Sequence, residues 1–289
     1  MVVTTIYLTR HGFRTNWIVD PKTGQYQTNI PSPTGITGDV PLAAYGERQS
    51  EELATALSAI DDPPISRIYS SPFYRCLQTL QPFAEKSGIE VRGDNGLGEW
   101  YGVADFPHPI PANASELRTL FPWYATNYAP SGIPPLTGET LPELHDRCAY
   151  ALQYIIASAD AEDNENDKAL GKTPNGNDFP GRRSAILICA HAASLIALAR
   201  ALTGKMPDDM SKEDFKTYTC GISKFERRHT ALGNCEIYLP VEAGMPVPRI
   251  EWRDGKGVAG GWNCVTNGDC SHLEGGEERG WGFKDAGIF

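Results

Sequence analysis

Residues 184–190 read SAILICA, and this almost continuous apolar run restricts the fold of the chain more than any other segment. A strand with one face in water alternates apolar and polar residues, whereas a run without alternation is typical of a strand covered on both faces. The β-branched and aromatic residues of TTIYLTR, at 4–10, predict a second buried strand. Such strands lie in sheets with helices on both faces, so the chain is expected to have an α/β fold.

Helical patterns alternate with the predicted strands. Apolar residues recur at helical spacing, a proline opens one helix, and Gly204 is expected at the C-cap of another. The alternation predicts a three-layer α/β/α sandwich around a mainly parallel sheet, and residues 1–289, which show no linker and no internal repeat, are expected to form a single domain. The expected helices cover 47–60, 72–86, 141–158 and 191–202, and further strands cover 66–70 and 89–92.

Four segments fall outside this alternation. A long loop rich in proline and glycine is expected at 18–44, and an aromatic, proline-rich insert at 100–138 is expected to form a cap. The polar segment 160–182 predicts a mobile surface loop, and its acidic run at 160–167 is expected to be solvated. A C-terminal extension, 218–289, is expected to be β-rich. Its expected strands are 234–239 and 248–253.

The charge of the chain limits what it can bind. Its 289 residues include 26 lysines and arginines against 36 aspartates and glutamates, a formal net charge of −10. This balance argues against direct binding to nucleic acid or to an acidic membrane, because both are negatively charged. The sequence has no apolar run of the roughly 18 residues that span a bilayer, and its first residues lack the basic region of a secretory signal.

The seven cysteines are an odd number, and most lie in apolar surroundings. Such cysteines are expected to be reduced, buried thiols of an intracellular protein. Cys264 and Cys270 are close enough in the sequence to form a disulfide or to bind a metal. No neighbouring set of histidines and cysteines completes a zinc site, so two free thiols are the favoured interpretation.

Two histidines directly follow the two buried strands. The tripeptide RHG, at 10–12, ends the first strand, and His191 stands at the equivalent place after SAILICA. Ligands of open α/β sheets bind at this edge, so both histidines are expected in one pocket. Arg75, in the first turns of a helix, can reach the same edge, and Arg14 adds positive charge. These cations in a negatively charged chain indicate an anion site, with phosphate as the candidate ligand.

These segments, in this order, resemble the histidine phosphatase superfamily, also called the phosphoglycerate-mutase-like family. The resemblance covers about residues 4–205, and the number of ordered motifs makes it specific. It implies the same three-layer fold as the strand and helix patterns. The matching segments are RHG (10–12), DVPLAAYGERQ (39–49), SSPFYRCLQT (70–79), GLGEW (96–100), GET (138–140) and His191.

The resemblance also implies a reaction. His11 would be the nucleophile that attacks phosphorus to give a phosphohistidine, and Glu99 would protonate the leaving oxygen and then take a proton from water. Asp105 and Glu139 also lie near the predicted pocket and are alternatives for the proton donor. No metal or other cofactor is expected, because arginine and histidine supply the positive charge. The side chains that would hold the phosphoryl oxygens are Arg10, Arg14, Arg75 and His191.

Two residues depart from the family pattern. Phe13 stands where many relatives have Glu or Gln, and Ala192 stands where many have Gly. Neither departure removes a charged side chain from the predicted site, but Phe13 is expected to change how the phosphate loop is supported. The other histidines have no matching partner pattern and are expected to be surface or structural residues; they are His108, His145, His229 and His272.

The predicted cap indicates a substrate class. Between Gly93 and Asp146 the one lysine or arginine is Arg118, whereas mutases of this family need further cations to hold a small polyanion. Mutase activity is therefore not expected. The aromatic residues favour an aryl phosphate such as phosphotyrosine, or a protein surface, unless they pack on one another as the core of a lid. They are Trp100, Tyr101, Phe106, Phe121, Trp123, Tyr124 and Tyr128.

A narrower resemblance is to a fungal branch of the superfamily. RHGFRTNW, SPFYRCLQT, GLGEWYG, HAASLIALA and the C-terminal GGWNCVTNGDCSHLEGGEERGWGFKD are similar to the histidine phosphatase domain of a transcription factor IIIC tau subunit. This implies a nuclear location and transcription factor IIIC subunits as partners, with a phosphorylated protein or a small aryl phosphate as substrate. The alternative is a non-catalytic scaffold domain that binds phosphate or protein. Glu99 favours the enzyme, because a scaffold has no physical reason to retain a proton donor.

Overall fold

The computed structural model describes residues 2–169, 183–228 and 238–286. Its strands are β1 (Val2–Arg10), β2 (Trp17–Val19), β3 (Tyr26–Thr28), β4 (Ile65–Ser70), β5 (Val91–Gly93), β6 (Tyr124–Ala125), β7 (Arg183–Ala190), β8 (Ile222–Arg227) and β9 (Trp262–Asp269). Its α-helices are α1 (Ala44–Ser58), α2 (Tyr74–Ser87), α3 (Ala114–Leu120), α4 (Leu141–Ala169) and α5 (Ala192–Thr203), with 3-10 turns at Asn95–Leu97, Val258–Gly260 and Phe283–Ala286.

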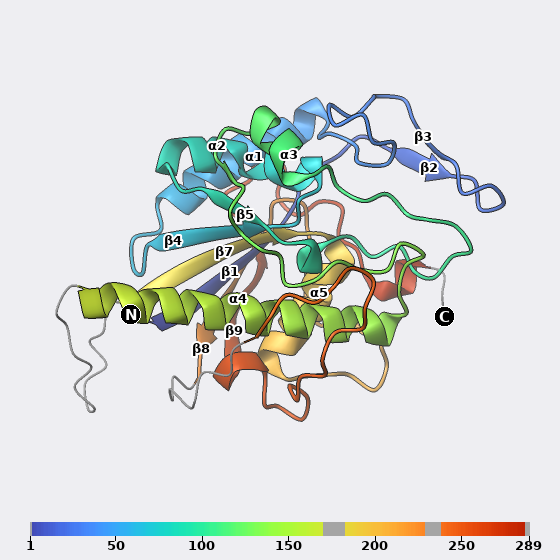
Figure 1. The fold of residues 1–289 in the computed structure, drawn as a ribbon. Coiled ribbons are helices and arrows are strands. Elements are labelled where there is room, and N and C mark those ends of the chain that lie inside the picture. The colour runs from blue at the N-terminus through green and yellow to red at the C-terminus, as the bar shows by residue number, and fades with distance from the viewer. Residues whose placement is uncertain (1, 170–182, 229–237, 287–289) are drawn as a thin grey trace.

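The main sheet of the described residues has seven strands in the order β6-β5-β4-β7-β1-β8-β9. The first five of these are parallel, whereas β8 pairs antiparallel with β1, and β9 pairs antiparallel with β8. Figure 1 shows α1, α2 and α3 on one face of the sheet and α4 and α5 on the other. The predicted three-layer α/β/α sandwich around a mainly parallel sheet is confirmed.

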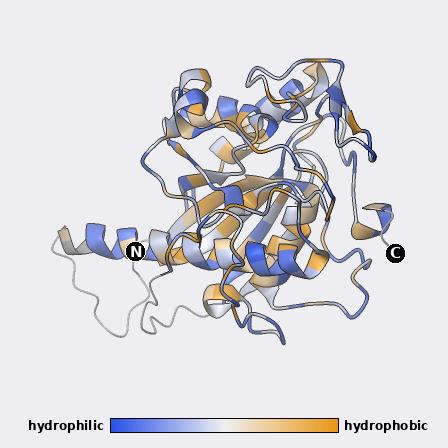
Figure 2. Cartoon of the chain, turned by 45° about the vertical axis from the view of Figure 1, so that its right-hand side comes forward, coloured by the Kyte–Doolittle hydropathy of each residue, from blue (hydrophilic) through white to orange (hydrophobic). Residues whose placement is uncertain are grey.

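Strand β7 shows why the sandwich forms. All of its residues after Arg183 are buried. Ile186 and Ile188 pack with buried residues of α4 and α5, whereas Leu187 and Cys189 pack with those of α1 and α2. A strand that buries apolar side chains on both faces needs a helical layer on each face. In Figure 2 the central strands are accordingly mostly orange, while the helices carry both colours.

Two junctions between a strand and a helix position the site. Helix α2 begins at Tyr74, two residues after Pro72. Helix α5 has His191 as its N-cap and ends at Gly204, whose φ is 75°. A side chain at 204 is excluded, because a Cβ there would lie 2.5 Å from the backbone nitrogen of Gly257. Both junctions lie where the sequence predicts them.

The polar segment after residue 158 is helical, so the expected loop is wrong for its first part. Helix α4 continues to Ala169, and residues 170–182 lie outside the described residues. Asp160 and Asp163 are buried, and each accepts a hydrogen bond at 2.7 Å, from Arg227 and Arg67 respectively. The helix projects both acids onto one face, toward arginines of β8 and β4, which the local sequence does not reveal. No described helix, α4 included, is both long and apolar enough to cross a membrane.

Part of the expected cap belongs to the core. Residues 114–120 form α3, and Tyr124 pairs with Val91 as the edge strand β6. Phe121, Trp123 and Tyr124 are buried in the cluster that α2 covers. These three aromatic residues therefore stabilise the domain and do not reach the predicted pocket, because the chain returns to the sheet edge between two loop segments.

The C-terminal extension contains β-strands, but they lie elsewhere than expected. Residues 248–253 form no strand, and most of the other expected strand falls within 229–237, outside the described residues. The strands β8 and β9 instead extend the main sheet beyond β1. The Asn, Gly and Asp residues of β9 disfavour strands, and β9 forms because its backbone pairs with β8. The expected loop at 18–44 also contains part of a short hairpin, β2–β3.

Candidate active site

The predicted site lies at the carboxyl edge of the parallel strands. Arg10, the last residue of β1, pairs with Ala190, the last residue of β7. His11 and His191 therefore follow neighbouring strands, and their ring centroids are 5.4 Å apart. The two side chains are almost completely buried, at 2% and 0% exposure. The structure thus brings together the two histidines that the strand pattern places at one edge.

The hydrogen bonding of His11 sets its tautomer. Its Nδ1 lies 2.8 Å from the carbonyl oxygen of Gly12. A carbonyl oxygen accepts only, so Nδ1 carries the proton and Nε2 keeps a free lone pair. Burial, together with the positive charges of Arg75 and Arg10, holds the pKa of His11 well below its usual value. His11 is therefore a neutral imidazole with a nucleophilic nitrogen at physiological pH.

His191 is held from both ring nitrogens. Its Nε2 lies 2.8 Å from the hydroxyl oxygen of Ser71, and its Nδ1 lies 3.3 Å from a carboxylate oxygen of Glu99. Burial disfavours the charged imidazolium, as does Arg75, whose Nη2 lies 3.2 Å from Nδ1, but the contacts with Cys76 and Glu99 outweigh both and raise the pKa of His191. The two histidines thus have opposite tendencies, because a carboxylate contacts His191 whereas the charges of three arginines act on His11.

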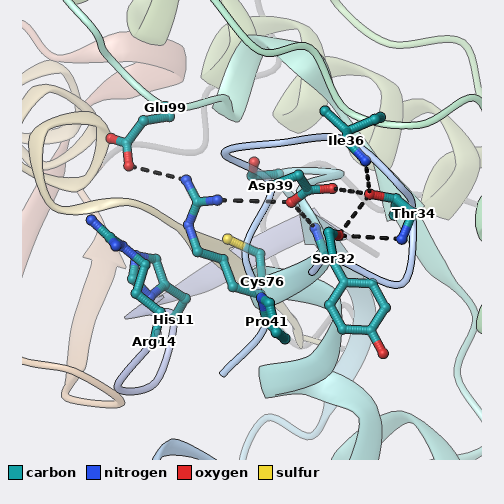
Figure 3. A network of polar contacts seen from close by, with 12 residues as sticks. His11, Arg14, Ser32, Thr34, Ile36, Asp39, Pro41, Cys76 and Glu99 are labelled. Atoms are coloured by element: carbon teal, nitrogen blue, oxygen red, sulfur yellow. Dashed lines mark hydrogen bonds and ion pairs between the residues drawn. The ribbon is translucent and has the colours of Figure 1, made fainter. Parts of the chain in front are cut away.

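Arg75 lies between the carboxylates of Asp39 and Glu99, both labelled in Figure 3. Its Nη2 donates to Glu99 at 3.1 Å, and its Nη1 lies 3.8 Å from Asp39, within ion-pair range but beyond a hydrogen bond. Asp39 accepts from the backbone N–H of Tyr74 at 2.8 Å and from the hydroxyl of Thr34 at 3.2 Å. Burial raises the pKa of Asp39 to about 6, although Arg75 opposes this shift. The backbone of α2 therefore fixes the carboxylate of Asp39, which in turn orients the guanidinium of Arg75.

The other two arginines are held by backbone carbonyls. Arg10 donates through Nη1 to Thr217 at 2.8 Å and also to the carbonyl of Arg279. Arg14 donates through Nη1 to its neighbour Thr15 at 2.9 Å, and its guanidinium lies 5.4 Å from the ring centroid of Trp17. Burial lowers the pKa of both arginines to about 10, so both stay charged at neutral pH. No carboxylate neutralises either one directly by a hydrogen bond among the described residues.

Of the three acids that the sequence offers as proton donors, Glu99 contacts Arg75 and His191. Burial alone would raise its pKa, but His191 and Arg75 outweigh burial and hold the pKa well below the usual value. The two rival acids differ: Asp105 is exposed on the rim, and both carboxylate oxygens of Glu139 accept from Arg147 Nε, at 2.9 and 3.0 Å. Glu99 is thus the candidate proton donor, and in the free protein it is ionised.

Unpaired donors gather at the same place. Among the described residues, nine buried side-chain nitrogen or oxygen atoms have no hydrogen-bond partner. Five of them belong to residues in or beside this cleft: Arg10 Nε, Trp17 Nε1, Arg75 Nε, Arg75 Nη1 and the Tyr101 hydroxyl. A buried donor without a partner costs free energy, and an anion with several acceptor oxygens would satisfy such donors together.

Motif residues without a predicted role support the loop after β1. The backbone N–H of Gly12 donates to Thr79 at 2.9 Å, and that of Phe13 donates to Gln49 at 2.9 Å. Sequence reasoning assigned no role to Thr79, Gln49, Ser71 or Asp39, although all four lie in the segments 39–49 and 70–79. The ring of Phe13 packs against Tyr45 with centroids 5.9 Å apart. Although Phe13 departs from the family pattern, the loop after β1 is still supported through its backbone N–H groups.

Aromatic side chains from three segments form the walls of the cleft, whose volume is about 770 Å³. The hairpin β2–β3 contributes Trp17 and Tyr26, the insert contributes Tyr101, and the C-terminal segment contributes Trp281. His108 also lines the cleft: its ring stacks on Tyr101 with centroids 4.8 Å apart, and its Nδ1 lies 2.8 Å from the Tyr26 hydroxyl. His108 is thus a structural residue of the cleft wall, placed closer to the site than its sequence pattern indicated.

His145, His272, Cys264 and Cys270 lie outside this arrangement. His145 is buried and donates to the carbonyl of Leu141, and His272 donates to that of Cys220, so both are structural. His229 lies outside the described residues. The two cysteines with alternative interpretations, Cys264 and Cys270, are free thiols.

A model of the histidine phosphatase superfamily, branch 1, matches residues 6–164, which is more than half of the chain. The chain therefore belongs to the histidine phosphatase superfamily. It is 33% identical to the transcription factor tau 55 kDa subunit of Saccharomyces cerevisiae over 98% of its own length, and it spans 59% of that protein. It is also 33% identical to phosphoglycerate mutase-like protein 4 of Arabidopsis thaliana, over 52% of this chain and 59% of that protein.

A solved structure shares the fold. The ecdysone phosphate phosphatase of Bombix mori, in complex with tungstate, superposes with a TM-score of 0.53 and 19% sequence identity. The match covers 77% of this chain and 89% of that chain. The chain spans about three fifths of the length of the first two relatives. At 19% sequence identity, the likeness to the insect enzyme concerns the fold alone.

Proposed function

We propose that the protein is a phosphomonoester hydrolase that works through a phosphohistidine on His11. The observation that carries this proposal is a neutral imidazole, with its Nε2 lone pair free, among arginines whose buried N–H groups lack partners. An imidazole in this state is a nucleophile, and the unpaired donors match the oxygens of a phosphoryl group. Positioning and charge neutralisation are the main requirements of phosphoryl transfer.

The proposed reaction has two displacements. In the first, His11 Nε2 bonds to phosphorus while the ester P–O bond breaks, and the leaving oxygen takes a proton from Glu99. In the second, water bonds to phosphorus, gives its proton to Glu99, and the N–P bond breaks to release inorganic phosphate. Arg10, Arg14, Arg75 and His191 would hold the phosphoryl oxygens throughout both steps.

Substrate binding would protonate Glu99. In the free protein Arg75 and His191 keep this carboxylate ionised. A phosphate dianion held by the same two cations would compete for their positive charge and place a like charge beside Glu99, so its pKa would rise. The acid needed for the first step would therefore form when the substrate is in place.

The proposal requires no metal ion. Within the described part of the chain, one ligand atom from each of His11, Glu99 and His191 lies within 4.8 Å of the others, a spacing that a metal could use. Three guanidinium groups around this set would repel a cation, and they attract the phosphate dianion. Turnover in excess EDTA tests this point.

The lining of the cleft supports a class of substrate, and the relatives support a cellular setting. Aromatic side chains line the cleft, which supports an aryl phosphate, such as phosphotyrosine in a protein. The similarity to the tau 55 kDa subunit supports association with transcription factor IIIC, with RNA polymerase III transcription and with the nucleus. The ionised Glu99 supports the rival function, a phosphate-binding scaffold without turnover.

Hydrolysis assays separate the two functions. p-Nitrophenyl phosphate and a phosphotyrosine peptide are incubated with the parent protein, His11→Ala and His272→Ala, all in EDTA. His272 contacts Cys220 outside the cleft and serves as the matched control. The phosphatase predicts turnover by the parent and His272→Ala, at least about 10⁴-fold lower turnover by His11→Ala, and an acid-labile phosphate on His11 by mass spectrometry. Equal rates for the parent and His11→Ala would contradict the phosphatase and favour the phosphate-binding scaffold.

A further inference from the structure

A second hollow shares a wall with the cationic cleft. The space open to the centre of a water-sized group is about 40 Å³, and prolines and aliphatic side chains form half of its lining residues. Glu99, Tyr101 and His108 line both cavities. The stacked rings of Tyr101 and His108 therefore separate a place for a phosphate from a place for an apolar group.

Backbone hydrogen bonds connect the two loop segments that form this hollow. The backbone N–H of His108 donates to the carbonyl of Leu136 at 2.7 Å, and that of Ala104 donates to Thr137 at 2.9 Å. Gly138, with φ of 83°, lies so close that a Cβ there would overlap the carbonyl oxygen of Gly102. The two loop segments, 101–111 and 133–138, are thus tied together, and proline rings further limit their motion.

The mouth of the hollow exposes apolar surface. Ile110 and Leu136 are 51% and 54% exposed, and both line the hollow, as do Pro109 and Pro135. No lysine or arginine of the described segments lines it, and its two carboxylates, Glu99 and Glu139, both pair with arginines inside the protein. Exposed aliphatic side chains around a preformed apolar hollow are typical of a binding site for an apolar group.

We propose that this hollow binds an aliphatic side chain of the phosphorylated protein segment whose phosphorylated residue occupies the cleft. The proposal rests on the proposed function and adds a sequence preference to it. The wall is one pair of rings with centroids 4.8 Å apart. An extended chain advances about 3.3 Å per residue, so a segment whose phosphorylated residue lies in the cleft passes this wall within a few positions. A small aryl phosphate does not reach the hollow.

The test compares phosphotyrosine peptides that carry leucine or glycine at two or three positions on either side of the phosphotyrosine. Dissociation constants are measured by calorimetry with His11→Ala, which retains the hollow and cannot turn over the peptide. Burial of one leucine side chain predicts about 10-fold tighter binding at one of these positions. Leu136→Asp, added to His11→Ala, is expected to reduce that preference to about 2-fold or less.

Val265→Asp is the matched control, because Val265 is also 54% exposed and lies on β9 away from the hollow. It is expected to keep the leucine preference. With His11 present, Leu136→Asp is expected to hydrolyse p-nitrophenyl phosphate like the parent. A missing leucine preference, or one that survives Leu136→Asp, overturns the inference. A leucine preference without any turnover of p-nitrophenyl phosphate supports the hollow as a binding site and overturns the phosphatase instead.

Discussion

The residues at the strand ends and the residues of the surrounding loops differ in what they contribute to the site. His11, Arg75 and His191 stand on or directly beside strands and helices that pack in the core, and each is almost completely buried. Trp17 and Tyr101 come from the hairpin β2–β3 and the insert, which project from the sheet (Figure 1). Charged side chains that must face one phosphorus atom need a rigid frame, which here consists of the strand and helix ends that carry His11, Arg75 and His191. The loops form the walls of the cleft, and they can vary without disturbing that frame.

Arg75→Ala is expected to have the largest effect on the frame. It leaves Asp39 and Glu99 without their shared cation, so kcat/KM should fall by roughly 10³-fold and stability by about 3 kcal/mol or more. Phosphatase assays and urea unfolding measure the two losses. Arg92→Ala, which loses an ion pair with Glu162 outside the site, should lose stability and keep kcat/KM. Equal loss of activity in both variants would contradict the assignment of Arg75.

Glu99→Gln is expected to separate substrates by their leaving groups. An alkoxide leaving group needs a proton and p-nitrophenolate does not, so the variant should lose about 10²–10⁴-fold on an alkyl phosphate and much less on p-nitrophenyl phosphate. Rates of both substrates are compared with those of the parent. Asp105→Asn, the variant of the rival acid on the rim, should show no such difference. A uniform loss on both substrates would remove Glu99 from the role of proton donor.

Asp39→Asn is expected to change the pH dependence of stability. Burial raises the pKa of Asp39 from 3.8 to about 6 in the folded protein, so the folded state binds this proton more tightly than the unfolded state. Stability from this group is present below pH 3.8 and declines as pH rises through about 6, by roughly 3 kcal/mol in total. Urea unfolding at pH 4.5 and 7 should show the variant gaining on the parent at pH 7. A pH-independent difference contradicts the raised pKa.

Trp17→Ala is expected to have the smallest effect, because it changes a wall and leaves His11, Arg75 and His191 in place. The loss of one aromatic contact should raise KM for an aryl phosphate by about 10-fold and leave KM for an alkyl phosphate nearly unchanged. Steady-state kinetics on the two substrates measure the difference. Ile18→Ala, at the neighbouring exposed position, should change neither KM. A loss of kcat for both substrates would place Trp17 in the frame.

The frame could be predicted from the sequence because its signals are local. An apolar run followed by a histidine defines a strand end, and parallel strands bring such ends to one edge, so His11 and His191 could be paired across 180 residues. The walls could not be predicted in the same way. Whether Phe121 packs in the core or Tyr101 lines the cleft depends on where the chain returns to the sheet, and aromatic content alone does not show this.

Partners distant in the sequence account for the other differences. Asp160 and Asp163 look like part of a solvated loop until Arg227 and Arg67 are placed opposite them. The strand β9 has few strand-forming residues and depends on β8 for its conformation. Trp281 reaches the cleft from the C-terminal segment, which showed no sign of this in its own sequence beyond resemblance to relatives. Each of these contacts is set by tertiary packing and has no local signal.

The carbonyl groups that hold Arg10 determine when, during protein synthesis, the phosphate site can be completed. They belong to Thr217 and Arg279, which lie 207 and 269 residues further along the chain. At about 5–20 residues per second, a ribosome adds the second of them roughly 13–54 seconds after Arg10. A nascent chain that ends near residue 205 carries every motif of the family and still lacks both acceptors. Full phosphate-binding strength should therefore appear only after Arg279 has been added.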